Sequence, residues 1–198
     1  MVVALAVALV LNRPVTRDQA AVRSVHAVVH GDIDSLCQMA TGEEKASFCG
    51  ERKGELGGWL RQSFQSWRKS GQPVTTAMPG DAMDEATLAL RDAQGQTVHI
   101  RALVRAERGQ YFGVGTITGA IMSAVMARRP MRAEETSTEG LYQALVASRS
   151  DLERIGVDRF PAPQGDESWG WDQMLARQSE RVRIRTERES KARQAGRL

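Results

Sequence analysis

Apolar and polar residues alternate along residues 85–118 in three runs, separated by turn-like segments at residues 92–95 and 107–110. Alternation with period two is typical of strands that bury one face, so the pattern predicts a three-stranded antiparallel meander. The third strand is expected to span residues 112–117, and residues 73–77 are expected to add an edge strand. The buried face of the first two strands should comprise Ala86, Leu88, Leu90, Val98, Ile100, Ala102 and Val104.

Helical spacing precedes the strands. Residues 15–30 predict a helix that ends at Gly31, and Asp32 can cap a second, short helix. A third helix is expected between Gly50 and Gly71. Its apolar face would carry Leu56, Leu60, Phe64 and Trp67.

Helical patterns return after the strands. Residues 120–129 are amphipathic, and Thr136 with Glu139 forms a possible capping box for a helix that Gly156 ends. A long polar helix is expected at the C-terminus. The predicted fold class is therefore α+β, with N-terminal helices packed on a curved antiparallel sheet and a helical C-terminal extension. The expected divisions are an apolar anchor or signal-like segment (residues 1–14), the α+β domain (residues 15–118) and the helical extension with a basic C-terminal tail (residues 119–198).

The charge of the chain is unevenly distributed. The 198 residues carry a net charge of +3, but residues 172–198 alone hold eight basic and four acidic residues. This basic tail could contact phosphates or acidic lipid. Because Glu180, Glu187 and Glu189 interrupt it, a dedicated nucleic-acid surface is not expected.

Residues 1–11 are uninterrupted apolar sequence. A membrane-spanning helix needs about 17 residues or more, so this segment alone is too short to cross a bilayer. Three interpretations stay open: the end of a membrane anchor, an atypical signal peptide, or a buried terminal element. The first two predict a membrane-anchored or exported, extracytoplasmic protein.

Cys37 and Cys49 flank a short segment where two helices could fold back on each other. A disulfide between them would contribute on the order of 2–3 kcal/mol. The alternative is two buried free thiols.

His99 and Arg101 share the polar face of the second predicted strand. If this face lined a pocket, His99 could act as a general base or bind an anion, although a solvated strand face is the simpler expectation. Trp59 on the third helix is assigned to the same possible pocket.

His26 and His30 have the spacing of a metal pair on a helix, and Asp32 or Asp34 could be a third ligand. No third His or Cys has suitable spacing, so ordinary helix-surface histidines are favoured and neither a metal nor a cofactor is expected.

The C-terminal helix carries a narrow apolar stripe beside its basic residues. The stripe could contact a protein partner or pack on the chain's own core, with the two tryptophans that precede it as the expected anchor. The residues assigned to partner contact are Trp169, Trp171, Met174, Arg181, Val182 and Arg185.

Two segments resemble the nuclear transport factor two-like domains of bacterial exported proteins. The run AVRSVHAVVHGDIDSLCQMAT is similar to their opening helix, Gly-Asp step and second helix, and DAQGQTVHIRALVRAERGQYFGVGTI is similar to their closing strands. The resemblance covers about residues 15–118 and implies a cone-shaped α+β domain. The Asp and His catalytic residues of that family have no matching positions here.

These features predict a non-enzymatic, exported or membrane-tethered binding or assembly module. It would act through a sheet-face pocket and the C-terminal helices, on a protein partner or on a second copy of itself. Two alternatives stay open: a small acid–base enzyme of the isomerase or cyclase type with a cone-shaped pocket near His99, and a structural subunit of a larger membrane complex.

Overall fold

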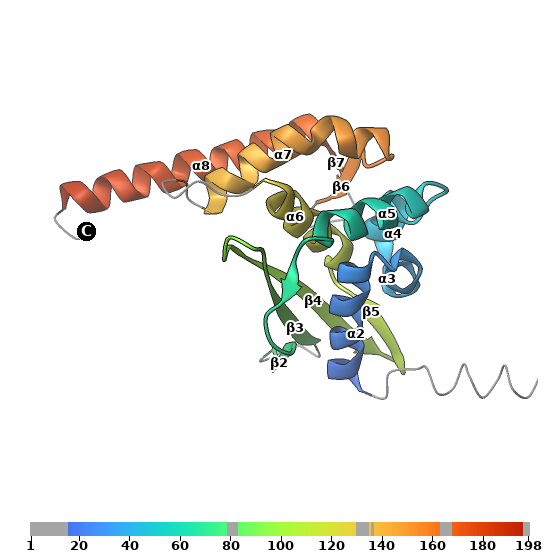
Figure 1. The fold of residues 1–198 in the computed structure, drawn as a ribbon. Coiled ribbons are helices and arrows are strands. Elements are labelled where there is room, and N and C mark those ends of the chain that lie inside the picture. The colour runs from blue at the N-terminus through green and yellow to red at the C-terminus, as the bar shows by residue number, and fades with distance from the viewer. Residues whose placement is uncertain (1–15, 79–82, 130–134, 136, 163–167, 196–198) are drawn as a thin grey trace, which may run out of the picture.

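The computed structural model describes residues 16–78, 83–129, 135, 137–162 and 168–195. The predictions for residues 1–14 and for Thr136 fall outside these residues. Within the described residues, four helices come first, then five strands, then three helices interrupted by a small ribbon (Figure 1). In chain order the elements are α2 (Arg17–His30), α3 (Ile33–Met39), α4 (Gly42–Phe48), α5 (Lys53–Phe64), β1 (Arg68–Lys69), β2 (Val74–Ala77), β3 (Met83–Arg91), β4 (Thr97–Glu107), β5 (Gln110–Gly113), α6 (Thr116–Arg128), α7 (Ser137–Arg154), β6 (Arg159–Pro161), β7 (Ser168–Gly170) and α8 (Trp171–Gln194).

The predicted α+β class is confirmed. β3 is the centre of a curled antiparallel sheet, paired with β1 and β2 along one edge and with β4 along the other. Alternate residues of β3 and β4 are fully buried, and α2 contacts both strands on that face (Figure 1). The expected buried face is confirmed except at Val98, which is half-buried.

The third strand of the meander is shorter than predicted. β5 ends at Gly113, and α6 begins at Thr116, where a continuing strand was expected. Gly115 adopts φ 63°, in the left-handed region, which turns the chain out of the sheet. From this point the buried residues follow helical spacing rather than alternation, as Ile117, Ala120, Ile121, Ala124 and Val125.

The third predicted helix also ends early. α5 stops at Phe64, although Trp67 beyond it is still buried. Arg68 and Lys69 pair with the edge of β3, so the chain becomes extended before Gly71.

A close helix crossing explains the glycine in the middle of α5. A Cβ atom on Gly57 would lie 2.7 Å from the carbonyl oxygen of Gly31 and 3.0 Å from Cγ2 of Ile33. Gly31 itself adopts φ 62° at the end of α2. The turn between α2 and α3 therefore packs directly on α5, where a larger side chain has no room.

The C-terminal extension packs on the body of the molecule through an aromatic cluster. Phe160 of β6 is fully buried, with its ring 6.3 Å from Phe48 of α4 and 4.9 Å from Trp171 of α8. The indole N–H of Trp171 donates to the carbonyl oxygen of Val157 at 2.9 Å. The hydrophobic core consequently runs without a break from α2 to α8.

α7 and α8 form an antiparallel pair. Arg149 contacts Asp172 at one end of the pair, and Arg185 contacts Thr138 at the other. Thr138 is near the start of α7, so the final turns of α8 project past it (Figure 1). None of the described helices is long and apolar enough to span a membrane.

Candidate functional site

A groove of about 550 Å³ lies where one edge of the sheet faces the helical extension. Four elements contribute to it: β4, α6, α7 and α8. Its lining residues are Thr97, Val98, His99, Arg101, Met122, Ser123, Met126, Ser137, Thr138, Leu141, Gln178 and Arg181.

The groove exists because β5 is short. β5 pairs only with residues 104–107 of β4, so the first half of β4 has α6 instead of a strand at its outer edge. The hydroxyl of Ser123 donates to the carbonyl oxygen of His99 at 3.1 Å, and that of Thr116 donates to Leu103 at 3.3 Å. α6 thus covers the backbone groups of this edge while the side chains of β4 remain accessible.

The apolar side chains of the groove are Val98, Met122, Met126 and Leu141. Each is half-buried and packs against the core. Methionine side chains are flexible and polarisable, so two of them beside a leucine form a surface that adapts to different apolar groups.

The charged side chains of the groove are basic. Arg101 is 71% exposed and lies 3.6 Å from Glu85, and Arg181 is exposed with no ion pair among the described residues. His99, which lines the same groove, is exposed. No aspartate or glutamate occurs among the described lining residues, so the groove favours an anionic ligand group.

Gln178 is the polar lining residue that sequence reasoning missed. It is 6% exposed, and its side-chain oxygen has no hydrogen-bond partner among the described residues. Its amide nitrogen is 3.9 Å from the sulfur of Met174. The available signal was its position on the apolar stripe of α8, four residues after Met174 and four before Val182.

The structure brings together three residues that the sequence assigned to two different sites. His99 and Arg101, expected in a pocket, line the groove beside Arg181, expected at a partner contact. Trp59 does not join them, which corrects its assignment. It is 5% exposed on α5, and the guanidinium of Arg128 stacks 4.8 Å from the centre of its ring.

The expected aromatic anchor is inside the protein. Trp171 and Met174 are 4% and 5% exposed, so the apolar stripe packs on the chain's own core at these positions. Trp169 and Val182 are half-buried, and Arg185 is exposed and bonded to Glu189 at 2.8 Å. Trp171 and Met174 therefore lie inside the chain and not on an exposed contact surface.

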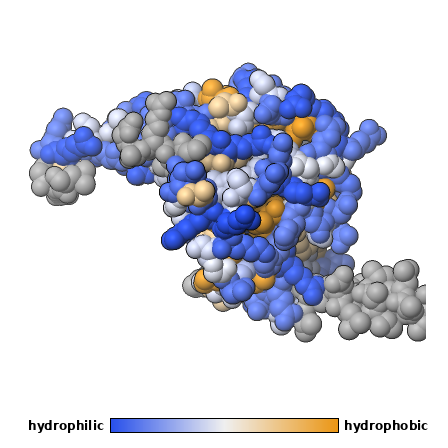
Figure 2. All heavy atoms as spheres, in the orientation of Figure 1, coloured by the Kyte–Doolittle hydropathy of each residue, from blue (hydrophilic) through white to orange (hydrophobic). Residues whose placement is uncertain are grey.

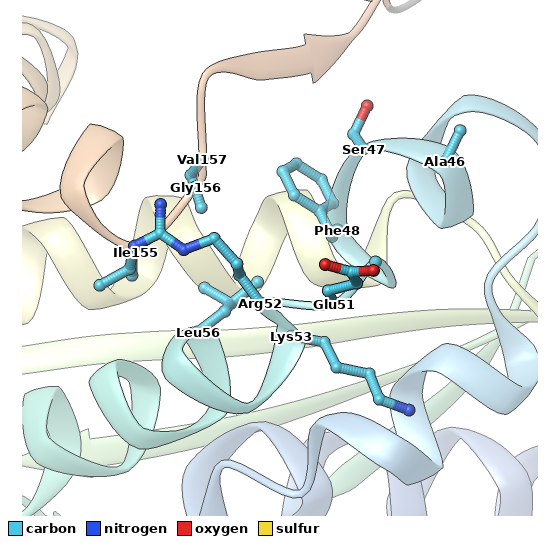
Figure 3. A pocket seen from close by; sticks show the side chains of 11 residues that line it. Ala46, Ser47, Phe48, Glu51, Arg52, Lys53, Leu56, Ile155, Gly156 and Val157 are labelled. Atoms are coloured by element: carbon cyan, nitrogen blue, oxygen red, sulfur yellow. The ribbon is translucent and has the colours of Figure 1, made fainter.

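A second, smaller cavity of about 190 Å³ lies between α4, α5 and the chain after α7 (Figure 3). Arg52 crosses it, forms two hydrogen bonds to Glu55, and donates to the carbonyl oxygen of Arg154. Figure 3 shows the Arg52 side chain directed at residues 155–157. Pockets for small molecules usually measure 300 Å³ or more, so this cavity is better explained as a joint between body and extension.

Glu44 is the buried carboxylate of α4. One of its oxygens accepts a hydrogen bond from the backbone N–H of Thr118 at 2.9 Å, and the other has no partner in the described structure. Burial raises the pKa of Glu44, and the hydrogen bonds from the start of α6 oppose this rise. Glu44 lines neither cavity.

The two helical histidines each contact a basic residue of another element. The ammonium of Lys69 lies 3.1 Å from Nδ1 of His26, while the carbonyl oxygen of His30 accepts from Arg61. Burial and the charge of Lys69 lower the pKa of His26. Within the described residues, no group of three or more His, Cys, Asp or Glu side chains could hold a metal ion.

The predicted disulfide is confirmed. Cys37 and Cys49 are bonded, with their Cα atoms 5.6 Å apart, and join the end of α3 to the end of α4. Structural disulfides persist in oxidising compartments, so the bond is consistent with an extracytoplasmic protein.

Comparison of the chain with protein-family models, with curated proteins and with solved structures gave no match.

Proposed function

We propose that this protein is a non-enzymatic binding module whose groove receives an acidic, partly apolar segment of a partner protein. The observation that carries the proposal is the composition of the groove: basic side chains from β4 and α8 beside the flexible apolar side chains of α6 and α7. Such a surface offers an acidic peptide both charge complementarity and apolar contact.

The filled interior of the sheet supports binding over catalysis. Ala20, Ala21, Val25 and Val28 of α2 are fully buried against the concave face, where a cone-shaped active site would need space. In the groove itself, His99 is the only residue suited to general acid–base work among the described lining residues. None of the described lining residues offers His99 a second titratable partner with which to divide the acid and base roles.

We also propose that the module is exported or tethered to a membrane through residues 1–11, and that residues 15–118 form a nuclear transport factor two-like domain. The disulfide supports export. The opening helix, the Gly-Asp step and the curled sheet support the domain assignment, while the helical conformation of residues 116 and 117 departs from a closing strand.

Selection from a library of random short peptides tests the proposed function. The immobilised full chain should enrich peptides that combine Asp or Glu with Leu, Ile or Phe. Reversing the two arginines of the groove, in the double variant Arg101→Glu and Arg181→Glu, should weaken the selected peptides about tenfold or more, because attraction becomes repulsion.

A matched variant controls for net charge. Arg68→Glu with Arg91→Glu makes the same charge change at an exposed pair on β1 and β3, outside the groove. This variant should bind the selected peptides as well as the unmodified chain does. Equal weakening by both double variants, or selection of peptides without acidic residues, would overturn the proposal.

A further inference from the structure

We propose that one face of α8 extends the groove into a docking ridge for an acidic helix of the partner protein; this inference rests on the proposed function. The ridge consists of Arg181, Ile184, Arg188 and Lys191. Successive members are three or four residues apart, which places them on one face of the helix. Arg181 also lines the groove, so the two surfaces are continuous.

The cations of the ridge are uncompensated. Arg181, Arg188 and Lys191 are exposed and have no ion pair among the described residues. The other arginines of this part of α8 differ, because Arg183 is held by Glu180 and Glu187, and Arg185 by Glu189. The acidic residues of α8 are therefore already engaged, and the ridge keeps its positive charge.

The shape of the ridge suits a helix. From Arg181 to Lys191 it measures about 15 Å at the helical rise, and its far end projects beyond the start of α7 (Figure 1). Figure 2 shows that the projecting end is covered by hydrophilic residues, and Ile184 adds a side chain that is 37% exposed. A partner helix with Asp or Glu at steps of three and four residues would place its carboxylates opposite these cations.

One other occupant fits less well. A second copy of the chain would place one basic ridge against another, since the nearby glutamates are already bonded to arginines.

The test measures binding of a labelled acidic peptide to the full chain by fluorescence anisotropy. The peptide has about 20 residues, long enough to form a helix, with Glu at alternating steps of three and four and Leu beside them. Binding should weaken as salt is raised, because exposed charges are screened. A peptide of the same composition in scrambled order, which cannot align its carboxylates, should bind about fivefold more weakly or worse.

The decisive variant reverses the charge at the projecting end, Arg188→Glu with Lys191→Glu, and should weaken the peptide about tenfold or more. Arg193→Glu reverses an exposed cation that helical spacing places on another face, and it should change binding less than about twofold.

The outcomes separate the ridge from the groove. If Arg101→Glu weakens binding and the ridge variant does not, the ridge is wrong and the groove survives. If neither variant weakens binding, both proposals fail. A third outcome is that the acidic peptide does not bind, that vesicles of anionic lipid do bind the unmodified chain, and that the ridge variant weakens vesicle binding. In that case a membrane surface replaces the partner helix and the inference is overturned.

Discussion

Glu44 connects two helices that are far apart in the sequence. Its carboxylate accepts from the N–H of Thr118, in the first turn of α6, where Gly115 at the N-cap position has no side chain to do so. The positive end of the helix dipole favours the charged carboxylate there, but its burial penalises that charge more strongly, because the pKa is raised.

This balance predicts how stability changes with pH. The folded protein holds the Glu44 proton more tightly than the unfolded chain, whose carboxyl pKa is about 4.5. The contribution of Glu44 to the free energy of unfolding is therefore full below that value and is lost as pH rises through the raised pKa of the folded state. Glu44→Gln, which cannot ionise, should gain stability relative to the unmodified chain across this window and keep a constant advantage above it.

Urea unfolding at a series of pH values measures this difference. Glu43→Gln removes the neighbouring, half-buried carboxylate and controls for the change in net charge. If the difference in free energy of unfolding between Glu44→Gln and the unmodified chain stays constant across the window, burial does not raise the pKa of Glu44.

At the scale of the elements, the disulfide holds α3 and α4 together. These helices have only seven residues each, too short to be stable alone. Cys37→Ala with Cys49→Ala should lower the free energy of unfolding by roughly 2–3 kcal/mol, since the unfolded chain loses a constraint.

The measurement is urea unfolding with and without reductant. The unmodified chain should shift toward the variant on reduction, and the variant should not respond. An unmodified chain that is equally stable with and without reductant would show that the bond carries no stability.

How well each element could be predicted depends on how local its signal is. The alternation that defines β3 and β4, and the capping residues around Gly31 and Asp32, act within a few residues, and the structure confirms both. The end of β5 was missed because the residues after Gly113 fit a strand as well as the helix that the core selects. β1 was missed because two residues carry no pattern; pairing with β3 alone makes it a strand.

The groove could be predicted only in part, because its parts come from four elements. Polar alternation on β4 identified His99 and Arg101, and the basic tail identified Arg181. Nothing local in the sequence indicates that these residues meet, or that Met122, Met126 and Leu141 form the surface beside them. The burial of Trp171 was equally hidden, since it depends on contact with Phe160 across the whole fold.

At the scale of the whole molecule, Phe160 joins the extension to the body. Phe160→Ala should cost about 3–5 kcal/mol, because it removes a fully buried ring from between Phe48 and Trp171. Unfolding should remain a single transition, since one core runs through both parts. Circular dichroism and tryptophan fluorescence, followed together in urea, measure both expectations.

Val146→Ala is the matched control for that loss. Val146 is 45% exposed on α7, so the truncation should change the free energy of unfolding by less than about 0.5 kcal/mol. Two separate transitions in the unmodified chain would show instead that the extension folds independently of the body.

The groove between β4, α6, α7 and α8 is proposed to bind an acidic segment of a partner. The most direct measurement maps the amide chemical shifts of the isotopically labelled full chain during titration with a library-selected peptide. Binding in the groove should produce shifts that cluster at residues 97–101, Met122, Met126, Leu141 and Arg181. Shifts concentrated instead around Arg52 and residues 155–157, or spread evenly over the basic surface, would contradict it.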